Sequence, residues 1–327
     1  MNLGYLNHPL CPWNLAERTV IRRPAEPGAG HWVGAPSLFQ EGDTLYLTYR
    51  FRRPRGQGRG YEARIARSQD GITFEDIWAI TQDQLDSPSM ERFALTRVED
   101  TYLLYVSYVD GRTNRWRIDV LEAARPDGFN PNQRLTVLTS DALHLEAVKD
   151  PVIVPAFGGL MMYASVAERL PHAKALSDAE LHASQDVYTS GLIRSGTGLA
   201  FSSDGRRFAW LGMALQPQEQ GWDQYTARVT TALPVPPGFL LFYDGGESVQ
   251  QNFEEVTGLA VTTDLLHVQR LTPERPLLES PYGPGAFRYV DYAELHGHWY
   301  FYYEIAEADG SHSLSVSMVP QAATRRK

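Results

Sequence analysis

Charged and aromatic residues gather at five places along the chain, each just before or at the start of an aromatic-rich segment. In chain order they are His31 and Trp32; Glu91 and Arg92; Lys149 and Asp150; Asp223, Tyr225 and Arg228; and Arg288, Tyr289 and Asp291. Converging carboxylates suit glycoside cleavage, in which one acid protonates the leaving oxygen and another activates water or attacks the sugar. Neighbouring Arg and Lys side chains would hold sugar hydroxyls or an anionic group in register.

The segments that follow these residues repeat one pattern, a turn containing Gly, Asp or Pro and then an aromatic-rich strand. Aligned on one tyrosine each, the copies are separated by 56, 58, 80 and 60 residues, with Tyr49, Tyr105, Tyr163, Tyr243 and Tyr303 as the aligned points. Each copy predicts a β-hairpin. The predicted turns are Gly42-Asp43, Glu99-Asp100, Gly158-Gly159, Pro237-Gly238 and His296-Gly297.

A second pattern, Ser-x-Asp-Gly, follows several of the hairpins. It occurs in the segments 66–74 and 200–208, and weaker forms occur at 126–129 and 261–264. An outer strand and a return strand joined by this turn would complete a four-stranded sheet. Repeated units of this length predict an all-β fold, a five-bladed β-propeller forming a single domain over residues 1–327. A two-sheet sandwich is the alternative fold.

The longest gap between hairpins predicts an inserted helix and loop in the third blade. Ser177 and Glu180 have the spacing of a capping box, which opens a short helix. In a propeller the innermost strands line a central channel, so the charged residues of all five places would meet around its mouth.

Composition excludes several other classes of protein. The net charge is −9 without long blocks of like charge, which argues against nucleic acid as a partner. A single cysteine, Cys11, excludes an internal disulfide, and the histidines lack metal-ligand spacing, so we expect neither metal nor cofactor. No apolar run is long enough for a membrane span, and no signal peptide is indicated, so we expect a cytoplasmic protein.

Several stretches resemble the five-bladed glycosidases, most closely glycoside hydrolase family 130, the β-mannoside phosphorylases and mannosidases. The matching stretches are YLTYR from Tyr46, ARSQDGITF from Ala66, TRVEDTYLLY from Thr96, Lys149-Asp150, Gly221-Trp222, GFLLFYDG from Gly238 and FYYEIAE from Phe301. The resemblance covers nearly the whole chain and implies a propeller that acts on a carbohydrate.

Three departures from these families bear on the chemistry. The family's acid is an Asp in a Glu-Asp-Pro-Arg stretch, and Arg92 stands at that position, leaving Glu91 as the nearest carboxylate. The family's phosphate-binding His falls on Asp244, whose carboxylate would repel phosphate. The base of the related arabinan-cleaving propellers falls on Ala35.

Together these observations predict a glycoside hydrolase-like protein for a small oligosaccharide or glycoside, with mannosides among the candidates. We expect Asp150 and Glu91 to form the acid–base pair, followed by Asp291. The expected substrate-binding residues are Arg50, Arg92, Lys149, Trp32, Trp222, Arg228, Asp244, Arg288 and Tyr289. The alternatives are a non-catalytic carbohydrate-binding propeller, a β-glycoside phosphorylase, and a scaffold for protein partners. The sequence leaves the sugar, the linkage, the stereochemical outcome and the oligomeric state open.

Overall fold

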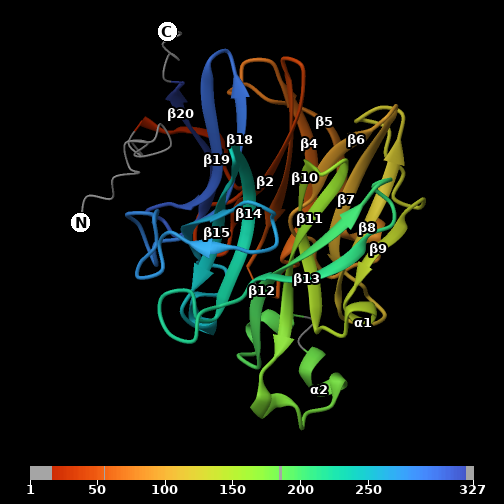
Figure 1. The fold of residues 1–327 in the computed structure, drawn as a ribbon, viewed down its shortest axis with the longest axis vertical. Coiled ribbons are helices and arrows are strands. Elements are labelled where there is room, and N and C mark those ends of the chain that lie inside the picture. Colours follow the sequence, from red (N-terminus) through yellow and green to blue (C-terminus); the bar gives the residue numbers. More distant parts are fainter. Residues whose placement is uncertain (1–16, 55, 184–185, 322–327) are drawn as a thin grey trace.

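Antiparallel hairpins between neighbouring segments build most of the structure (Figure 1). The computed structural model describes residues 17–54, 56–183 and 186–321. Cys11 and residues 322–327 lie outside this part of the chain. Within it, no helix is long and apolar enough to cross a membrane, and no group of three or more His, Cys, Asp or Glu side chains could hold a metal ion.

The strands form successive antiparallel groups in chain order. The first group contains β2 (Trp32–Glu41), β3 (Thr44–Arg52), β4 (Gly60–Ser68) and β5 (Glu75–Thr81). The second contains β6 (Ala94–Val98), β7 (Thr101–Val109), β8 (Trp116–Ala123) and β9 (Leu135–Thr139). The third contains β10 (Ala147–Ala156), β11 (Gly159–Arg169), β12 (Ile193–Ser202) and β13 (Ala209–Leu215).

The first and last described strands, β1 and β20, pair with each other in the last group. A fourth group contains β14 (Thr226–Val235), β15 (Gly238–Gly246), β16 (Val256–Thr262) and β17 (Gln269–Arg270). The last combines β18 (Phe287–Leu295), β19 (His298–Ala306), β20 (His312–Pro320) and the N-terminal β1 (Thr19–Arg22). Single parallel bridges, Trp32 to His312 and Ser195 to Thr226, join neighbouring groups.

The helices are short and lie between strands. They are η3 (Gln82–Leu85), α1 (Ser140–Leu143), η4 (Pro171–Ala173), α2 (Asp178–His182), η5 (Val187–Thr189) and η6 (Val249–Gln251). The predicted capping box at Ser177 and Glu180 is confirmed and opens α2. With η4 and η5, α2 belongs to the segment between β11 and β12, and it lies at the lower edge of Figure 1, beyond the ends of the strands.

Three of the five predicted hairpin turns are confirmed, and two are displaced by one residue. The third turn is Phe157-Gly158 and the fourth is Pro236-Pro237, since Ala156 pairs with Gly159 and Val235 pairs with Gly238. Phe157 and Gly158 both have positive φ, 54° and 76°. This backbone twist matches that of the flanking strands in a two-residue hairpin.

The alignment of the hairpins on five tyrosines is corrected by the strand register. Tyr105 and Tyr163 are equivalent, but the matching positions elsewhere are Thr48, Phe242 and Tyr302. Tyr49, Tyr243 and Tyr303 are therefore each one residue away. Aromatic residues occupy both faces of these strands, so an aromatic run alone does not determine which face a residue occupies.

Hydroxyl groups at the equivalent positions connect one strand group to the next. Each is buried and donates to a carbonyl in the turn after the third strand of the following group: Tyr105 to Gly205 at 2.7 Å, Tyr163 to Leu265 at 2.5 Å and Tyr302 to Gly71 at 2.8 Å. The last contact runs from β19 back to the first group. Inside these turns Asp70, Asp204 and Asp264 accept the same two backbone N–H bonds.

The hydrophobic core lies between adjacent groups. One cluster packs Leu47 and Tyr49 of β3 against Tyr300 and Tyr302 of β19. Others join β4 to β7, β7 to β11, and β15 to β19. The faces of the sheets are thus buried against their neighbours, which leaves the ends of the first strands to position polar groups.

Candidate functional site

A β-bulge recurs in or just before the first strand of each group, and the predicted site residues gather there. In each case two residues of the first strand, or of the segment just before it, face one residue on its partner, as between Gly34 and Ser37 in β2. The first bulge residues are Ala35, Arg92, Asp150, Val229 and Tyr289. Ala35, Asp150 and Tyr289 have positive φ, 51° to 57°. Bulges re-aim side chains, so these positions differ in direction from the rest of the strand.

Side chains from the preceding group satisfy several of the bulge N–H groups. The N–H of Ala35 donates to Glu304 Oε2 at 3.1 Å, and that of Tyr289 donates to both oxygens of Asp244 at 3.0 and 3.1 Å. Burial and the nearby Glu255 raise the pKa of Asp244 well above its ordinary value. The surroundings of Asp244 therefore favour its protonated form.

Next to the bulges lies a buried network of alternating charges. Each residue of the network forms an ion pair of 2.7 to 3.1 Å with the next one. In order, the residues are Arg52, Glu91, Arg50, Glu304, Arg288, Glu255 and Arg228. We call these seven residues, with Lys149 and Asp150, the charged cluster. None of the nine is more than 4% exposed. Each guanidinium between two carboxylates connects strand groups far apart in sequence.

The carboxylates of this network are held ionised. Burial alone would raise the pKa of Glu91, but Arg50, Lys149 and Arg52 lower it to about 2. Glu304 has a pKa well below its usual range because Arg288, Arg50 and His312 outweigh its burial. Arginines likewise lower the pKa of Glu255 against its burial. These groups can accept hydrogen bonds but do not carry a proton at neutral pH.

Lys149 and Asp150 are bound differently. Lys149 Nζ lies 3.4 Å from Asp150 Oδ2 and above the rings of Trp116 and Tyr188, at 4.9 and 4.6 Å from their centroids. Burial lowers the pKa of Lys149. Asp150 Oδ1 accepts the N–H of Arg92 at 3.3 Å, whereas Oδ2 accepts no hydrogen bond from the part of the chain that the structure describes. Asp150 is thus less tightly engaged than the other carboxylates.

Arg92 and Asp291 connect several strand groups. Arg92 donates to the carbonyl of Thr230 at 2.5 Å and to Asp291 Oδ2 at 3.0 Å. Asp291 also accepts from the Thr231 hydroxyl and the Leu38 N–H, at 2.7 and 2.9 Å. Burial raises the pKa of Asp291, and Arg92 opposes this. Both oxygens of Asp291 are therefore engaged by the protein, whereas Arg92 Nε has no hydrogen-bond partner among the described residues.

Aromatic rings lie against the charged cluster. Trp32 stacks on His312 with 4.3 Å between centroids, and the Arg52 guanidinium is 4.6 Å from the Trp32 centroid. The Tyr289 ring lies between Arg50 and Arg288, at 5.9 and 5.0 Å. Both rings thus contact cations, as expected for cation–π packing, and Trp32 also contacts the Phe253 ring at 6.3 Å.

Other predicted site residues have partners outside the cluster. Trp222 stacks on Tyr243 and donates to the Thr272 carbonyl at 3.0 Å. Asp223 accepts from Arg270 at 2.7 Å. Tyr225 donates to the carbonyl of Tyr188, and His31 lies 4.0 Å from Glu26.

Sequence reasoning missed several members of the site: Arg52, Glu255, Glu304, His312, Trp116 and Tyr188. Glu304 could have been found, because it faces Arg288 across the hairpin and ends the aromatic stretch FYYE. Glu255 lies in a connection between strands and has no local pattern.

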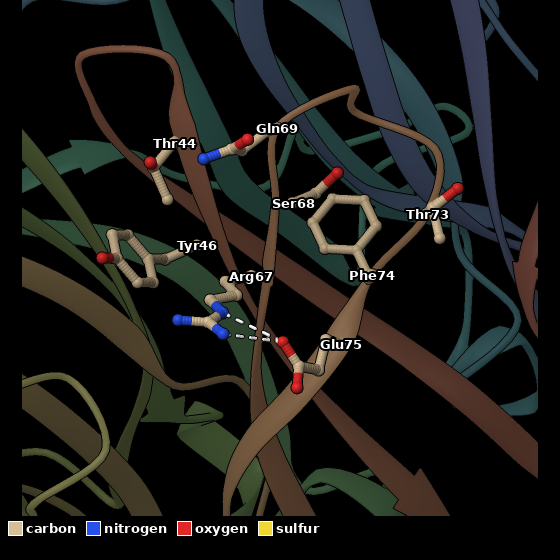
Figure 2. A pocket seen from close by; sticks show the side chains of 8 residues that line it. All are labelled: Thr44, Tyr46, Arg67, Ser68, Gln69, Thr73, Phe74 and Glu75. Carbon is tan, nitrogen blue, oxygen red and sulfur yellow. Dashed lines mark hydrogen bonds and ion pairs between the residues drawn. The ribbon is translucent and has the colours of Figure 1, made fainter.

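A separate open pocket lies on the outer strands of the first group (Figure 2). It is lined by Thr44, Tyr46, Arg67, Ser68, Gln69, Thr73, Phe74 and Glu75. Arg67 and Glu75 form an exposed ion pair of 2.8 Å. None of the lining residues belongs to the charged cluster.

Comparison with known proteins places the fold among the glycosidases. No family model matches the sequence, and no curated protein matches it. A β-1,2-mannobiose phosphorylase from Listeria innocua is 16% identical, with a TM-score of 0.59 and coverage of 98% of this chain and 97% of that one. A glycosyl hydrolase from Bacteroides ovatus is 13% identical, with a TM-score of 0.62 and coverage of 95% and 91%.

A third solved structure, the β-xylosidase RS223, is 13% identical, with a TM-score of 0.62 and coverage of 93% and 95%. At such low identity the likeness concerns the fold alone. It establishes a nearly all-β fold of the propeller glycosidase type, and thereby favours the propeller over the two-sheet sandwich.

Proposed function

We propose that this chain is a five-bladed β-propeller that hydrolyses a glycoside at the charged cluster, with Asp150 as the carboxylate that acts on the sugar. The strand groups described above would be the blades, with β1 completing the last of them. The equivalent bulges, and the hydroxyl-to-turn contacts that run from the last group to the first, support this arrangement. The glycosidase fold supports the reaction class.

One observation carries the assignment of Asp150. It is the only carboxylate among the five first bulge residues, and its Oδ2 accepts no hydrogen bond from the described residues. Lys149 provides one ion pair to it. A carboxylate with an oxygen still available can take a proton from water or attack a sugar, which a carboxylate bonded to two guanidinium groups does poorly.

A proton donor must complement Asp150. Glu91, expected from the sequence to share this chemistry, is held ionised by Arg50 and Arg52, so we assign it to positioning those arginines. Burial favours the protonated form of Asp244, which lies across the hairpin from Arg228 and is our candidate acid. Asp291 is bound by Arg92 and Thr231 and is assigned a structural role.

A second function, carbohydrate binding without turnover, is favoured by a specific observation. Ala35 and Val229 occupy two first bulge positions where a carboxylate could have faced the substrate, and Arg92 occupies a third. A binder needs hydrogen-bonding groups but no pair of carboxyl groups in opposite protonation states.

A panel of chromogenic glycosides, assayed with and without phosphate, separates these functions. A hydrolase releases product without phosphate, and Asp150→Asn is then expected to reduce turnover by a factor of about 10² to 10⁴. Asp244→Asn keeps an acceptor for the Tyr289 N–H and should reduce turnover of substrates with poor leaving groups most. Glu75→Gln, in the exposed pair of Figure 2, is the matched control and should leave turnover unchanged.

Each outcome of this panel has a consequence. Wild-type turnover in Asp150→Asn would remove the assignment of this residue. Product formation only in the presence of phosphate would indicate the phosphorylase alternative. Saturable sugar binding without product from any glycoside would favour the second function. The cytoplasmic location stays a prediction from the sequence.

A further inference from the structure

Several buried donors, and one carboxylate oxygen, are left without hydrogen-bond partners around the charged cluster. Within the described part of the chain, no hydrogen-bond partner is found for Arg50 Nη2, Trp32 Nε1, Trp116 Nε1 or Asn252 Nδ2. All four side chains belong to residues no more than 6% exposed. A buried donor without an acceptor costs about 1–3 kcal/mol, so such atoms usually have a ligand or a water as partner.

These donors surround the cations of the cluster. Trp32 lies against Arg52 and Arg288, whose guanidinium carbons are 4.6 and 5.1 Å from its centroid. Trp116 lies beneath Lys149, and Asn252 accepts from Arg228 at 3.3 Å through its Oδ1. The unsatisfied donors therefore lie beside the cations of the charged cluster.

The acceptors of the cluster are already occupied. Glu91 binds Arg50 and Arg52, and Glu255 binds Arg228 and Arg288. Glu304 binds Arg50, Arg288 and His312. Asp150 alone has an oxygen that accepts no hydrogen bond from a described residue, and that oxygen faces Lys149.

The charges are also unequal. Five cations face four carboxylates within the charged cluster: Arg50, Arg52, Lys149, Arg228 and Arg288 against Glu91, Asp150, Glu255 and Glu304. The adjoining Asp244 does not correct this difference, because its burial favours the neutral form. An added anion would balance the cluster.

Hydroxyl groups of a neutral sugar would use these atoms incompletely. A hydroxyl donates one hydrogen bond as well as accepting, and among the described carboxylates of the cluster only Asp150 has an oxygen left to receive it. A carboxylate accepts up to four hydrogen bonds and donates none. Charge-assisted bonds to Arg and Lys are also roughly twice as strong as neutral ones.

We propose that the sugar bound at the charged cluster is acidic, a hexuronic acid or its glycoside, whose carboxylate accepts from Arg50 Nη2 and Lys149 Nζ. Trp32 and Trp116 donate to its remaining oxygens. This inference rests on the proposed function only in taking the ligand to be a carbohydrate. It does not depend on turnover.

The test compares binding of acidic and neutral sugars by isothermal titration calorimetry. The ligands are glucuronate, galacturonate and mannuronate, each paired with its neutral hexose, and inorganic phosphate as a competing anion. At least one uronate is expected to bind roughly tenfold more tightly than its neutral partner, as one charged hydrogen bond would give. The preference should decline as salt is added.

Variants link the preference to the named donors. Lys149→Met removes the charge but keeps the length of the side chain, and should bring the uronate affinity to that of the neutral sugar. Trp116→Phe keeps an aromatic ring below Lys149 and removes the indole N–H together with the five-membered ring that carries it, so a loss of roughly fivefold is expected even if Lys149→Met folds poorly. Arg67→Met removes an exposed cation elsewhere and should change nothing.

The outcomes separate this inference from the proposed function. Three results would overturn the inference. No uronate binds at millimolar concentration, each uronate binds only as tightly as its neutral hexose, or phosphate binds more tightly than any uronate. If Trp116→Phe prefers uronates over neutral sugars as strongly as wild type does, the assignment of the named donors is wrong. If the protein cleaves only neutral glycosides, the proposed hydrolysis is supported and the inference is overturned. If it binds a uronate but cleaves no glycoside, the inference is supported and the proposed hydrolysis is not.

Discussion

Replacing Glu91 by glutamine tests whether the charged cluster is organised as the structure indicates. Glu91 is 2% exposed and accepts from Arg50 Nε at 2.7 Å and from Arg52 Nη1 at 3.1 Å. Its pKa in the folded protein is about 2, against an ordinary value of 4.5. That difference corresponds to about 3 kcal/mol of folding stability. Removal of one partner from a buried ion pair costs a similar amount, about 3–5 kcal/mol.

The same shift fixes the direction of the pH dependence. Because the pKa is depressed by folding, the contribution of Glu91 is fully present above about pH 4.5 and is lost as the pH falls toward 2. Wild-type protein should therefore lose stability through this range. Glu91→Gln should be less stable by about 3 kcal/mol at pH 7 and should lose less on acidification.

Urea unfolding followed by tryptophan fluorescence, at pH values from 3 to 7, measures both effects. Glu75→Gln is the control, because Glu75 is 68% exposed and forms a single ion pair with Arg67. Such surface pairs contribute less than about 1 kcal/mol. A Glu91→Gln variant within about 0.5 kcal/mol of wild type at pH 7, or one with an unchanged acid dependence, would refute the arrangement of the cluster.

Four further substitutions, in three experiments, test contacts that join the strand groups. Tyr105→Phe removes the hydroxyl donated to the next turn and should lower the free energy of unfolding by about 1–2 kcal/mol in urea titrations. Arg92→Met and Asp291→Asn should each destabilise the protein, and a double-mutant cycle should give a coupling of about 0.5–3 kcal/mol; additive effects would argue against the pair. Gly60→Ala places a methyl group 1.8 Å from the carbonyl oxygen of Met90 and should cost about 1–3 kcal/mol or more; a melting temperature equal to that of wild type would contradict this close approach.

The hairpins and turns could be predicted because their signals are local. Glu99-Asp100 and His296-Gly297 lie where the sequence placed them, and the Asp204 turn is bonded as the Ser-x-Asp-Gly pattern indicates. The register was harder, because both faces of strands such as β15 and β19 are buried and aromatic. Tyr243 and Phe242 are adjacent and equally apolar in context, so the sequence could not tell which of them faces the next group.

The site could be predicted only in part, for a different reason. Glu91, Lys149 and Asp150 precede a recognisable strand pattern, whereas the partners that decide their chemistry come from distant segments. Glu255 is an example, since it binds Arg228 and Arg288 from a connection without a repeat signature. The sequence predicted a carboxylate ring. In the structure Glu91, Glu304, Asp244 and Asp291 are bound through both oxygens to arginine or to other donors of the protein, whereas Asp150 has one oxygen that accepts no hydrogen bond from the described residues.

A network of this kind is a poor means of stabilising a β-fold by itself. Burying two charges costs several kcal/mol of desolvation for each ion, and an apolar replacement of equal volume is often as stable or more so. Nine charged residues below 5% exposure therefore require an explanation beyond folding. Binding of an anion supplies one, because it would use the donors that the protein leaves without acceptors. A ligand at a hundred times its dissociation constant stabilises the folded state by about 2.7 kcal/mol. A uronate that binds the cluster should accordingly raise the unfolding midpoint in wild-type protein and fail to do so in Lys149→Met, whereas equal stabilisation of both proteins would place the anion elsewhere.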